Sequence, residues 1–362
     1  MVMKANTHQR FAVLDGLRGI AALIVVMIHG QEYLGVEFIH HGYLMVDLFF
    51  VISGFVLAAA YGDTLAKGGM GRWFMKIRLL RLYPMALLGL AIGVVFYVLA
   101  AHTVPSYRGM PSVLPLLLAG LFFVPLLAGG PISPLNIPGW SLIFEIWVNA
   151  VYGYAARTLT FRRLIVVVTL AFLGLVAAVA LNHDLDVGAR QRNVLGGVAR
   201  VLFSFPLGIL IHRLWIAGRL ARLRCSAVAV WGMAPALALI ALAGKSGLFD
   251  LAVVTVVFPA MIALAVVATV PRGLAVVFAA AGRISYPLYA IHGPVLLLCE
   301  LGFTVLGPKG PIALEQRAAV VAGAIVLAVA LAWASDRWID APLRAWIGAR
   351  RERRFHAVAP VL

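Results

Sequence analysis

Long apolar stretches, separated by short polar or basic segments, recur along the whole chain. Segments of about 20 apolar residues are long enough to cross the hydrocarbon core of a membrane as helices, whereas membrane β-barrels show shorter, alternating segments. The pattern therefore predicts an all-α, polytopic integral membrane protein with about ten transmembrane helices. The predicted spans cover approximately residues 11–29, 44–61, 83–101, 139–156, 164–181, 195–212, 226–243, 249–270, 284–303 and 318–338.

One further apolar segment, residues 113–128, is shorter and contains Pro115 and Pro125. With the N-terminus in the cytoplasm, ten spans place 22 of the 30 lysines and arginines on the inner side, six on the outer side and two within spans. This asymmetry follows the positive-inside rule. An extra crossing would move several basic clusters outside, so the charges favour a re-entrant or interfacial helix over 113–128. Both termini are then predicted to be cytoplasmic.

Composition supports a membrane location. Of the 362 residues, 63% are hydrophobic and 12% are charged, against about 25% charged residues in soluble domains. The net charge of +16 lies in short loops between spans, so no nucleic-acid partner is expected. Two cysteines suggest neither a disulfide framework nor a metal site.

The domain organisation is expected to be simple. One transmembrane domain is predicted over 1–341, followed by a short basic cytoplasmic tail over 342–362. The first apolar stretch is long, carries charges and lacks a cleavage site, so it is not expected to be a removed signal peptide. No appended soluble domain is expected.

The first predicted span carries Asp15, Arg18 and His29. Ionisable groups inside a membrane cost several kcal/mol unless they find partners or line a wet cavity, so they are candidates for function. Arg18 and His29 are eleven residues apart, which is about 16 Å along a helix and roughly 20° from the same face. A local ion pair between Asp15 and Arg18 is the simpler alternative for those two.

Four ionisable groups fall at similar depth in the outer third of the membrane: His29, Asp47, Glu145 and Arg200. Each alone could be a residue at a helix end. Together they predict a solvated polar cavity, because isolated charges at that depth are costly. A carboxylate beside a histidine fixes the tautomer of the ring and favours proton uptake, as a general base requires.

The inner side carries a basic cluster. Arg78 and Arg81 are spaced i,i+3 and share a helix face, with Arg72 and Lys76 close by. The cluster is either a positive-inside loop or a phosphate clamp, since the guanidinium fork binds phosphates bidentately. Arg18 points to the same region. A ligand with phosphates at one end and a reactive group at the other, such as acyl-coenzyme A, would bridge this cluster and an outer base.

Six segments occur in order over nearly the whole chain: LDGLRGIAALIVVMIH, GYLMVDLFFVISGFVL, IRLLRLYP, PGWSLIFEIWVNAVY, GRISYPLYAIHGPV and WIDAPLRAW. They resemble acyltransferase family 3, membrane proteins that O-acetylate lipopolysaccharide, exopolysaccharide, Nod factors and related glycans. The resemblance implies an acyl-CoA donor substrate, no permanently bound cofactor, catalysis at His29 with Arg18 essential, and donor binding by Arg78 and Arg81. Glu145 matches the carboxylate of the family's Trp-Ser/Thr-Leu-x-x-Glu motif.

The chain departs from the family pattern at three positions. Ile146 stands where many members have a second acidic residue, Asn149 stands where tyrosine is common, and Asp340 replaces the usual glutamate before Pro342. These departures leave the core assignment in place and concern the type of acceptor.

Further polar and aromatic residues have two interpretations each. His292 could make a helix-packing hydrogen bond near Pro287 and Pro294, or line the donor tunnel. Trp140 fits a membrane-interface anchor, or could stack on a sugar ring of the acceptor. His40 and His41 lie in an outer loop and are expected to be solvated rather than catalytic.

The resulting hypothesis is an O-acyltransferase of the bacterial inner membrane, surrounded by membrane lipids. An acyl-CoA, in the first instance acetyl-CoA, enters from the cytoplasm and reaches His29, which Glu145 or Asp47 assists. His29 deprotonates a hydroxyl of a glycan or lipid-linked saccharide on the outer side, where Arg200 helps to bind the acceptor. Direct attack and an acyl-histidine intermediate both remain open. The alternative hypothesis is a multi-span transporter or flippase.

Overall fold

The computed structural model describes residues 11–107, 111–223, 225–308, 312–346 and 348. Its described part is helical apart from one isolated β-bridge. The α helices are α1 (Ala12–Leu34), α2 (Met45–Ala66), α3 (Gly71–Thr103), α4 (Val113–Leu121), α5 (Trp140–Ala155), α6 (Phe161–Asn182), α7 (Val194–Ile216), α8 (Ala227–Leu242), α9 (Gly247–Ala252), α10 (Phe258–Ala265), α11 (Arg272–Leu306) and α12 (Leu314–Ser335). Two π-helical segments interrupt or extend them, η5 (Val253–Val257) between α9 and α10 and η6 (Asp336–Asp340) after α12.

Eight helical segments of the described chain are long and apolar enough to cross a membrane. The protein is therefore a polytopic membrane protein, and each predicted span overlaps a helix or, for 249–270, the α9–η5–α10 segment. Two other helices at predicted spans, α5 and α8, have 16 residues each. That length gives about 24 Å, which is less than the roughly 30 Å of a hydrocarbon core.

Two helices begin well before their predicted spans. α3 starts at Gly71 rather than at residue 83, and α11 starts at Arg272 rather than at residue 284. In α3 the added turns carry Arg72, Lys76, Arg78 and Arg81, whereas in α11 they are mostly apolar and lie between Arg272 and Arg283. As a result Arg78 and Arg81 lie on α3 itself and not in a loop.

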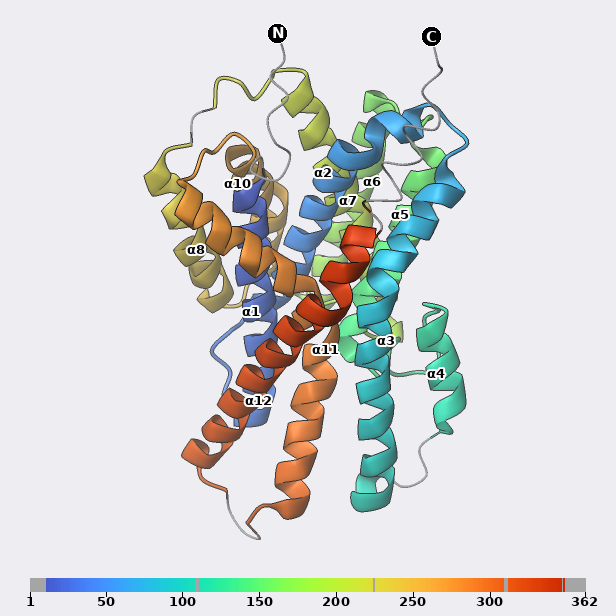
Figure 1. Ribbon diagram of the computed structural model, residues 1–362, viewed down its shortest axis with the longest axis vertical. Coiled ribbons are helices and arrows are strands. Elements are labelled where there is room, and N and C mark those ends of the chain that lie inside the picture. The colour runs from blue at the N-terminus through green and yellow to red at the C-terminus, as the bar shows by residue number, and fades with distance from the viewer. Residues whose placement is uncertain (1–10, 108–110, 224, 309–311, 347, 349–362) are drawn as a thin grey trace.

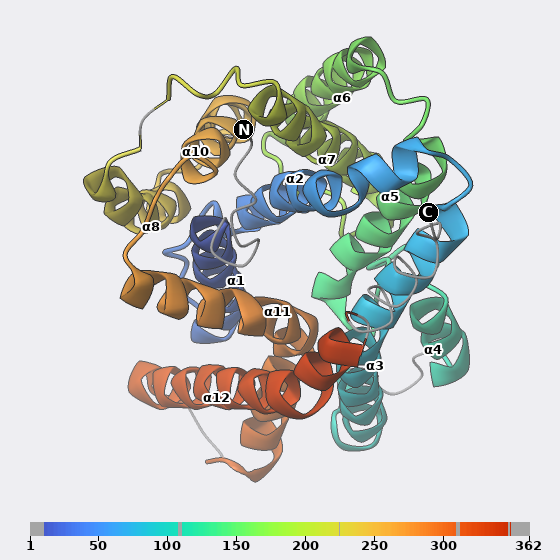
Figure 2. The ribbon, with the colours of Figure 1, turned by 45° about the horizontal axis from the view of Figure 1, so that its top comes forward.

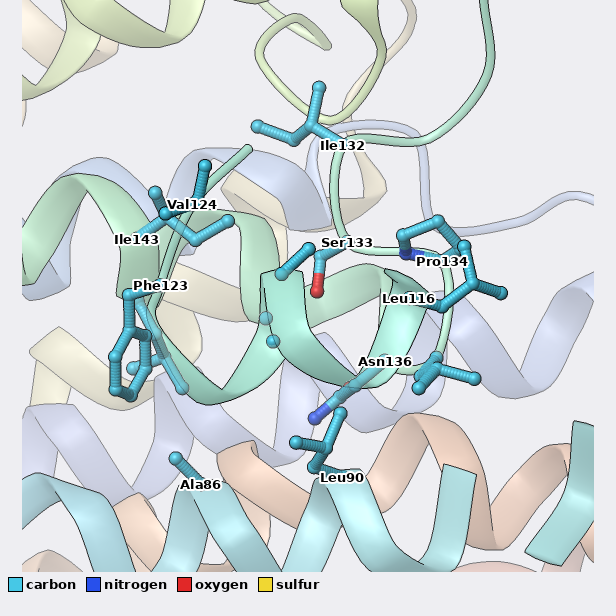
Figure 3. A pocket seen from close by; sticks show the side chains of 15 residues that line it. Ala86, Leu90, Leu116, Phe123, Val124, Ile132, Ser133, Pro134, Asn136 and Ile143 are labelled. Carbon is cyan, nitrogen blue, oxygen red and sulfur yellow. The ribbon is translucent and has the colours of Figure 1, made fainter. Parts of the chain in front are cut away.

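α4 covers part of the segment predicted as a re-entrant or interfacial helix. It has nine residues, about 14 Å, and is too short to cross a membrane. It packs beside α3 (Figure 1), where Leu116 of α4 joins a small core with Leu90, Tyr97 and Leu135. A cavity of about 30 Å³ lies between α3, α4 and α5, lined by mostly apolar side chains (Figure 3).

The main helix contacts join α1 to α11, α2 to α7, α6 to α7, and α12 to the outer face of α11 (Figure 2). Glycine permits the closest of these contacts. A Cβ atom on Gly54 of α2 would lie 2.0 Å from the Phe205 carbonyl oxygen, and one on Gly208 of α7 would lie 2.1 Å from the Val51 carbonyl oxygen. Small residues of this kind let membrane helices approach closely.

α11 carries two internal prolines, Pro287 and Pro294. Because proline lacks an N–H group, Pro294 leaves the Ala290 carbonyl without its helical donor. The side-chain amide of Asn136 donates to that carbonyl at 2.8 Å. This bond attaches the segment before α5 to the middle of α11 and helps to place the two helices around a shared interior.

The predicted tail over 342–362 lies mostly beyond the described part. The helical segment that contains α12 continues to Trp346. The tail arginines Arg350, Arg351, Arg353 and Arg354 lie outside the described residues, as do Lys4, Arg10, Arg108, Arg224 and Lys309 of the charge count.

Candidate active site

A cavity of about 350 Å³ lies among α1, α2, α3, α5 and α11. Its walls combine apolar side chains with charged and hydroxyl groups, a mixture typical of ligand sites. The lining residues with polar groups are Asp15, Arg18, Ser53, Tyr61, Arg78, Arg81, Ser141, Glu145, Ser285, Tyr286 and Tyr289. The structure thus brings Arg18 of α1 into one lining with Arg78 and Arg81 of α3, although Arg18 and Arg78 are 60 residues apart in sequence.

Arg78 is held by an acidic partner. Its Nη2 donates to Oε1 of Glu145 at 3.2 Å, and the Ser53 hydroxyl donates to the same oxygen at 2.6 Å. Arg78 is buried, and its Nε has no hydrogen-bond partner among the described residues. A buried guanidinium with an unused donor is suited to bind an anion.

Arg18 lies near Asp15, with 4.0 Å between Nη1 and Oδ1. The local ion pair considered as the simpler alternative is therefore present. Asp340, in the closing motif of the chain, forms an ion pair with Arg344, with 2.9 Å between Nη1 and Oδ2, and interacts electrostatically with Arg81 and Arg18. The closing motif WIDAPLRAW, which contains Asp340, thus lies near the arginines of the cavity.

Tyr289 and Ser141 mark another part of the lining. Their hydroxyl oxygens are 2.6 Å apart, and the Tyr289 hydroxyl donates to the Pro138 carbonyl at 3.1 Å. The Ser141 hydroxyl also reaches the Pro138 carbonyl, at 3.4 Å, so either hydroxyl can donate to the other. Both side chains are buried, so the bonds fix this wall of the cavity.

His292 follows Tyr289 by three residues on α11 and lies outside the cavity lining. Its Nδ1 is 2.8 Å from the Tyr289 carbonyl oxygen and 3.2 Å from the Leu288 carbonyl oxygen, so Nδ1 carries the proton. Nε2 then holds a lone pair, and it has no hydrogen-bond partner among the described residues. Both carbonyls belong to α11 itself, so these bonds lie within one helix and do not join two helices, and the ring is fully buried.

His29 is the next ring outward. Its centroid is 5.3 Å from that of His292, while His292 is 5.7 Å from Tyr289. The His29 side chain is 30% exposed, and its Nδ1 lies 3.3 Å from Oε1 of Glu32. His29 does not line the cavity. It is connected to the cavity wall through the rings of His292 and Tyr289.

Asp47 and Arg200 do not join His29 in a solvated outer cavity, and the prediction of a four-group site at one depth is wrong for them. Both are fully buried and bind each other, with 2.7 Å between Arg200 Nη2 and Asp47 Oδ2 and 3.0 Å between Nε and Oδ2. Arg200 also donates to the carbonyls of Val187 at 2.9 Å and Tyr43 at 2.7 Å. Charges removed from water need such partners, and equal depth does not tell which way each side chain points.

Two other expectations need the same correction. Glu145, expected beside His29, binds Arg78 and Ser53 instead. Trp140 is buried and lies under the Arg200 guanidinium at 5.3 Å, so its ring face on that side contacts a cation of this chain rather than open solvent.

His41 is buried rather than solvated. Its Nδ1 is 2.6 Å from Oδ1 of Asp250 and its Nε2 is 2.9 Å from the Gly244 carbonyl oxygen. Tyr43 donates to Oδ2 of the same carboxylate at 2.8 Å. His41 and Asp250 are 209 residues apart in the chain, so no local pattern could have paired them. The sequence interpretation also missed Glu32, although its i,i+3 spacing from His29 was a readable signal.

A second small cavity, of about 30 Å³, lies among α1, α11 and α12. Tyr33, Glu300 and Arg317 supply its polar lining, and Tyr33 follows His29 by one helical turn. Within the described residues, no group of three or more His, Cys, Asp or Glu side chains is arranged to hold a metal ion.

Comparisons with known proteins agree with these motifs. A family model described as "Acyltransferase domain" matches residues 11–337. "Protein 2 in picA locus" of Rhizobium radiobacter is 37% identical over 197 residues, which are 49% of this chain and 99% of that protein. "Acyltransferase MdmB" of Streptomyces mycarofaciens is 30% identical over 172 residues, 41% of this chain and 42% of that protein.

"Exopolysaccharide production protein ExoZ" of Rhizobium meliloti is 31% identical over 199 residues, 54% of this chain and 57% of that protein. The chain thus spans nearly all of the first relative and about half of the other two. No solved structure matches.

Proposed function

Because this chain belongs to the acyltransferase family whose domain covers residues 11–337, we propose that it is an O-acyltransferase of the bacterial inner membrane. In this proposal it moves an acyl group, in the first instance acetyl, from acyl-CoA on the cytoplasmic side. The acceptor is a hydroxyl of a glycan or lipid-linked saccharide on the outer side. Membership in this family favours the enzyme over the transporter or flippase considered from the sequence.

The single observation that carries the proposal is the cationic cavity. Arg18, Arg78 and Arg81 line one space of about 350 Å³ and outnumber its two carboxylates, Asp15 and Glu145. The remaining positive charge would attract a polyanion. The phosphates of coenzyme A have this charge, and the guanidinium forks of Arg78 and Arg81 match phosphate oxygens.

The donor's reactive end is proposed to lie toward Tyr289. From Arg18 to His29 the helix axis rises about 16 Å, which a pantetheine arm can span. The arm would pass the apolar and hydroxyl side chains of the cavity, among them Ser141 and Tyr289. The thioester would then approach His292 and His29, the rings beyond this wall.

The proposed orientation rests on the charge asymmetry. We count ten crossings, including the short α5 and α8, and place the start of α1 on the cytoplasmic side. Both ends of the chain then lie in the cytoplasm. The arginine end of the cavity then faces the cytoplasm. His29, Glu32 and Tyr33 lie in the outer part of α1, where an acceptor could approach. The relative ExoZ is named an exopolysaccharide production protein, so an extracellular polysaccharide is a reasonable first acceptor to test.

In the proposed reaction His29 acts as the general base. It removes the proton from the acceptor hydroxyl while the oxygen attacks the thioester carbonyl carbon. The C–S bond breaks, and the coenzyme A thiolate leaves and takes up the proton that His29 releases. Direct attack and transfer through an acyl-histidine both use this placement.

The test uses sealed inside-out vesicles made from the source cells and acetyl-CoA labelled in the acetyl group. His29→Ala should abolish transfer of label to vesicle glycans while the protein remains inserted. His102→Ala is the matched control, because His102 is an exposed histidine that bonds the Val98 carbonyl of its own helix. Full transfer by His29→Ala would refute His29 as the base.

A further inference from the structure

The carboxylates expected to assist His29 have other partners. Asp47 binds Arg200, and Glu145 binds Arg78 and Ser53. The carboxylate that contacts His29 is Glu32, whose Oε1 lies 3.3 Å from His29 Nδ1. Residues three apart on a helix face each other, so this contact follows from the course of α1 alone.

The contact with Glu32 selects one tautomer of His29. When Nδ1 carries the proton and donates it to the carboxylate, Nε2 keeps a lone pair that can remove a proton. After proton transfer the imidazolium is stabilised by the same carboxylate. These are the roles that an orienting carboxylate has in nucleophile–base–acid triads.

His292 supplies a second acceptor on the inner side of His29. Its Nδ1–H is committed to backbone carbonyls, and its buried Nε2 lone pair has no partner among the described residues. The ring centroids of His29 and His292 are 5.3 Å apart. A hydroxyl, or the N–H of protonated His29, could therefore satisfy this lone pair with a small ring rotation. An unpaired buried acceptor is destabilising, so its presence beside the base indicates that a donor group binds there.

On these grounds we propose that Glu32 is the positioning residue of the His29 base, and that His292 is the buried acceptor that completes a Glu32–His29–His292 array. This inference rests on the proposed function of His29. It assigns neither Asp47 nor Glu145 to the base. Glu32 touches no reacting atom and acts through His29.

Other charged or titratable groups interact with His29 or Glu32 and must be held constant. His292 of α11 interacts with His29, and Asp186, between α6 and α7, interacts with both His29 and Glu32. Glu300 of α11 interacts with Glu32 and with Arg317 of α12. None of them is altered in the test.

The test compares pH–rate profiles of acetyl transfer for wild type, Glu32→Gln and Glu37→Gln in vesicles from the source cells. Glu32→Gln should lower the plateau rate by about tenfold, less than the roughly 10⁴-fold cost of losing a buried triad carboxylate, because Glu32 is 64% exposed. The acidic limb should move to lower pH, since protonated His29 has lost its carboxylate partner. High salt should reduce the difference between wild type and Glu32→Gln, because exposed charges are screened.

Glu37→Gln is the matched control. Glu37 is another glutamate of the outer surface spaced i,i+3 from a histidine, with 3.6 Å between its Oε1 and His40 Nδ1. It also accepts from Lys245 at 2.6 Å, and this hydrogen bond lowers the pKa of Glu37 below its usual value. Its variant should leave the profile of wild type unchanged, because it does not contact His29.

The outcomes separate this inference from the proposed function. If His29→Ala is inactive and Glu32→Gln has the same profile as Glu37→Gln, the role of Glu32 is refuted and His29 stands. If Glu32→Gln loses rate without any movement of the acidic limb, Glu32 is only structural and the inference is again refuted. If His29→Ala is fully active, the proposed base itself is wrong.

Discussion

The buried ion pair between Asp47 and Arg200 gives the sharpest prediction for stability. Arg200→Met removes the cation and leaves Asp47 buried, with the Ser204 hydroxyl at 3.3 Å as a remaining partner. It also leaves the Tyr43 and Val187 carbonyls without the guanidinium donors. Breaking a buried pair by removing one partner costs about 3–5 kcal/mol.

The expected shift in melting temperature follows from chain size. An unfolding entropy of about 2.1 cal/mol/K per residue gives about 0.76 kcal/mol/K for 362 residues. A loss of 3–5 kcal/mol therefore lowers the apparent Tm by about 4–7 °C. The measurement is thermal unfolding of the purified protein in one detergent at a fixed heating rate, since heat unfolding of large proteins is often irreversible.

The double variant Asp47→Leu/Arg200→Met provides the control. Replacing both charges with apolar side chains removes the uncompensated carboxylate, so the double variant should melt above Arg200→Met. An Arg200→Met protein with the wild-type Tm but impaired acetyl transfer would refute the reasoning. That result would support a role of Arg200 in acceptor binding, as its membrane depth predicted from the sequence suggested.

Two further predictions concern the donor cavity and helix packing. Arg78→Gln should weaken coenzyme A binding about 10–100-fold, as expected for a lost charge-assisted contact of 1.5–3 kcal/mol. At coenzyme A concentrations near 100 times the wild-type Kd, the Tm of wild type should rise by about 3–4 °C and that of Arg78→Gln by only about 0.5–2 °C. Arg72→Gln, on an open groove of α3, should respond like wild type. Equal responses of Arg78→Gln and wild type would contradict the phosphate clamp. Gly54→Ala should lower the free energy of unfolding by about 1–3 kcal/mol or more, because its Cβ would lie 2.0 Å from the Phe205 carbonyl oxygen. Gly232→Ala, which has open space around it, should melt at or slightly above the wild-type temperature. An unchanged Tm for Gly54→Ala would contradict the close α2–α7 contact.

Much of the helical layout could be predicted from the sequence because a membrane imposes a length on every apolar segment. Each predicted span overlaps a helical segment, and 113–128 contains only the short α4. The start of α3 could not be predicted from hydropathy, because its added turns carry four basic residues, and the added turns of α11 were missed although most of their residues are apolar. Pro294 can be read from the sequence, but not that the amide of Asn136, 154 residues away from Ala290, satisfies the carbonyl that this proline frees.

The candidate site was predictable where residues lie on one helix or in one motif, and less so across helices. The local pair of Asp15 and Arg18 follows from i,i+3 spacing. The predicted spans placed Asp47 and Arg200 at the same membrane depth as His29. Depth alone does not say which way a side chain points. The rotation of each helix about its axis decides which residues face one another, and it is set by tertiary contacts such as the one at Gly54.

The most direct test of the account is acetyl transfer by His29→Ala in sealed inside-out vesicles, measured together with stabilisation by coenzyme A. The account predicts no transfer of label to glycan and an unchanged rise of the apparent Tm with coenzyme A, because the arginine-lined cavity does not include His29. Transfer at the rate of the His102→Ala control would contradict it.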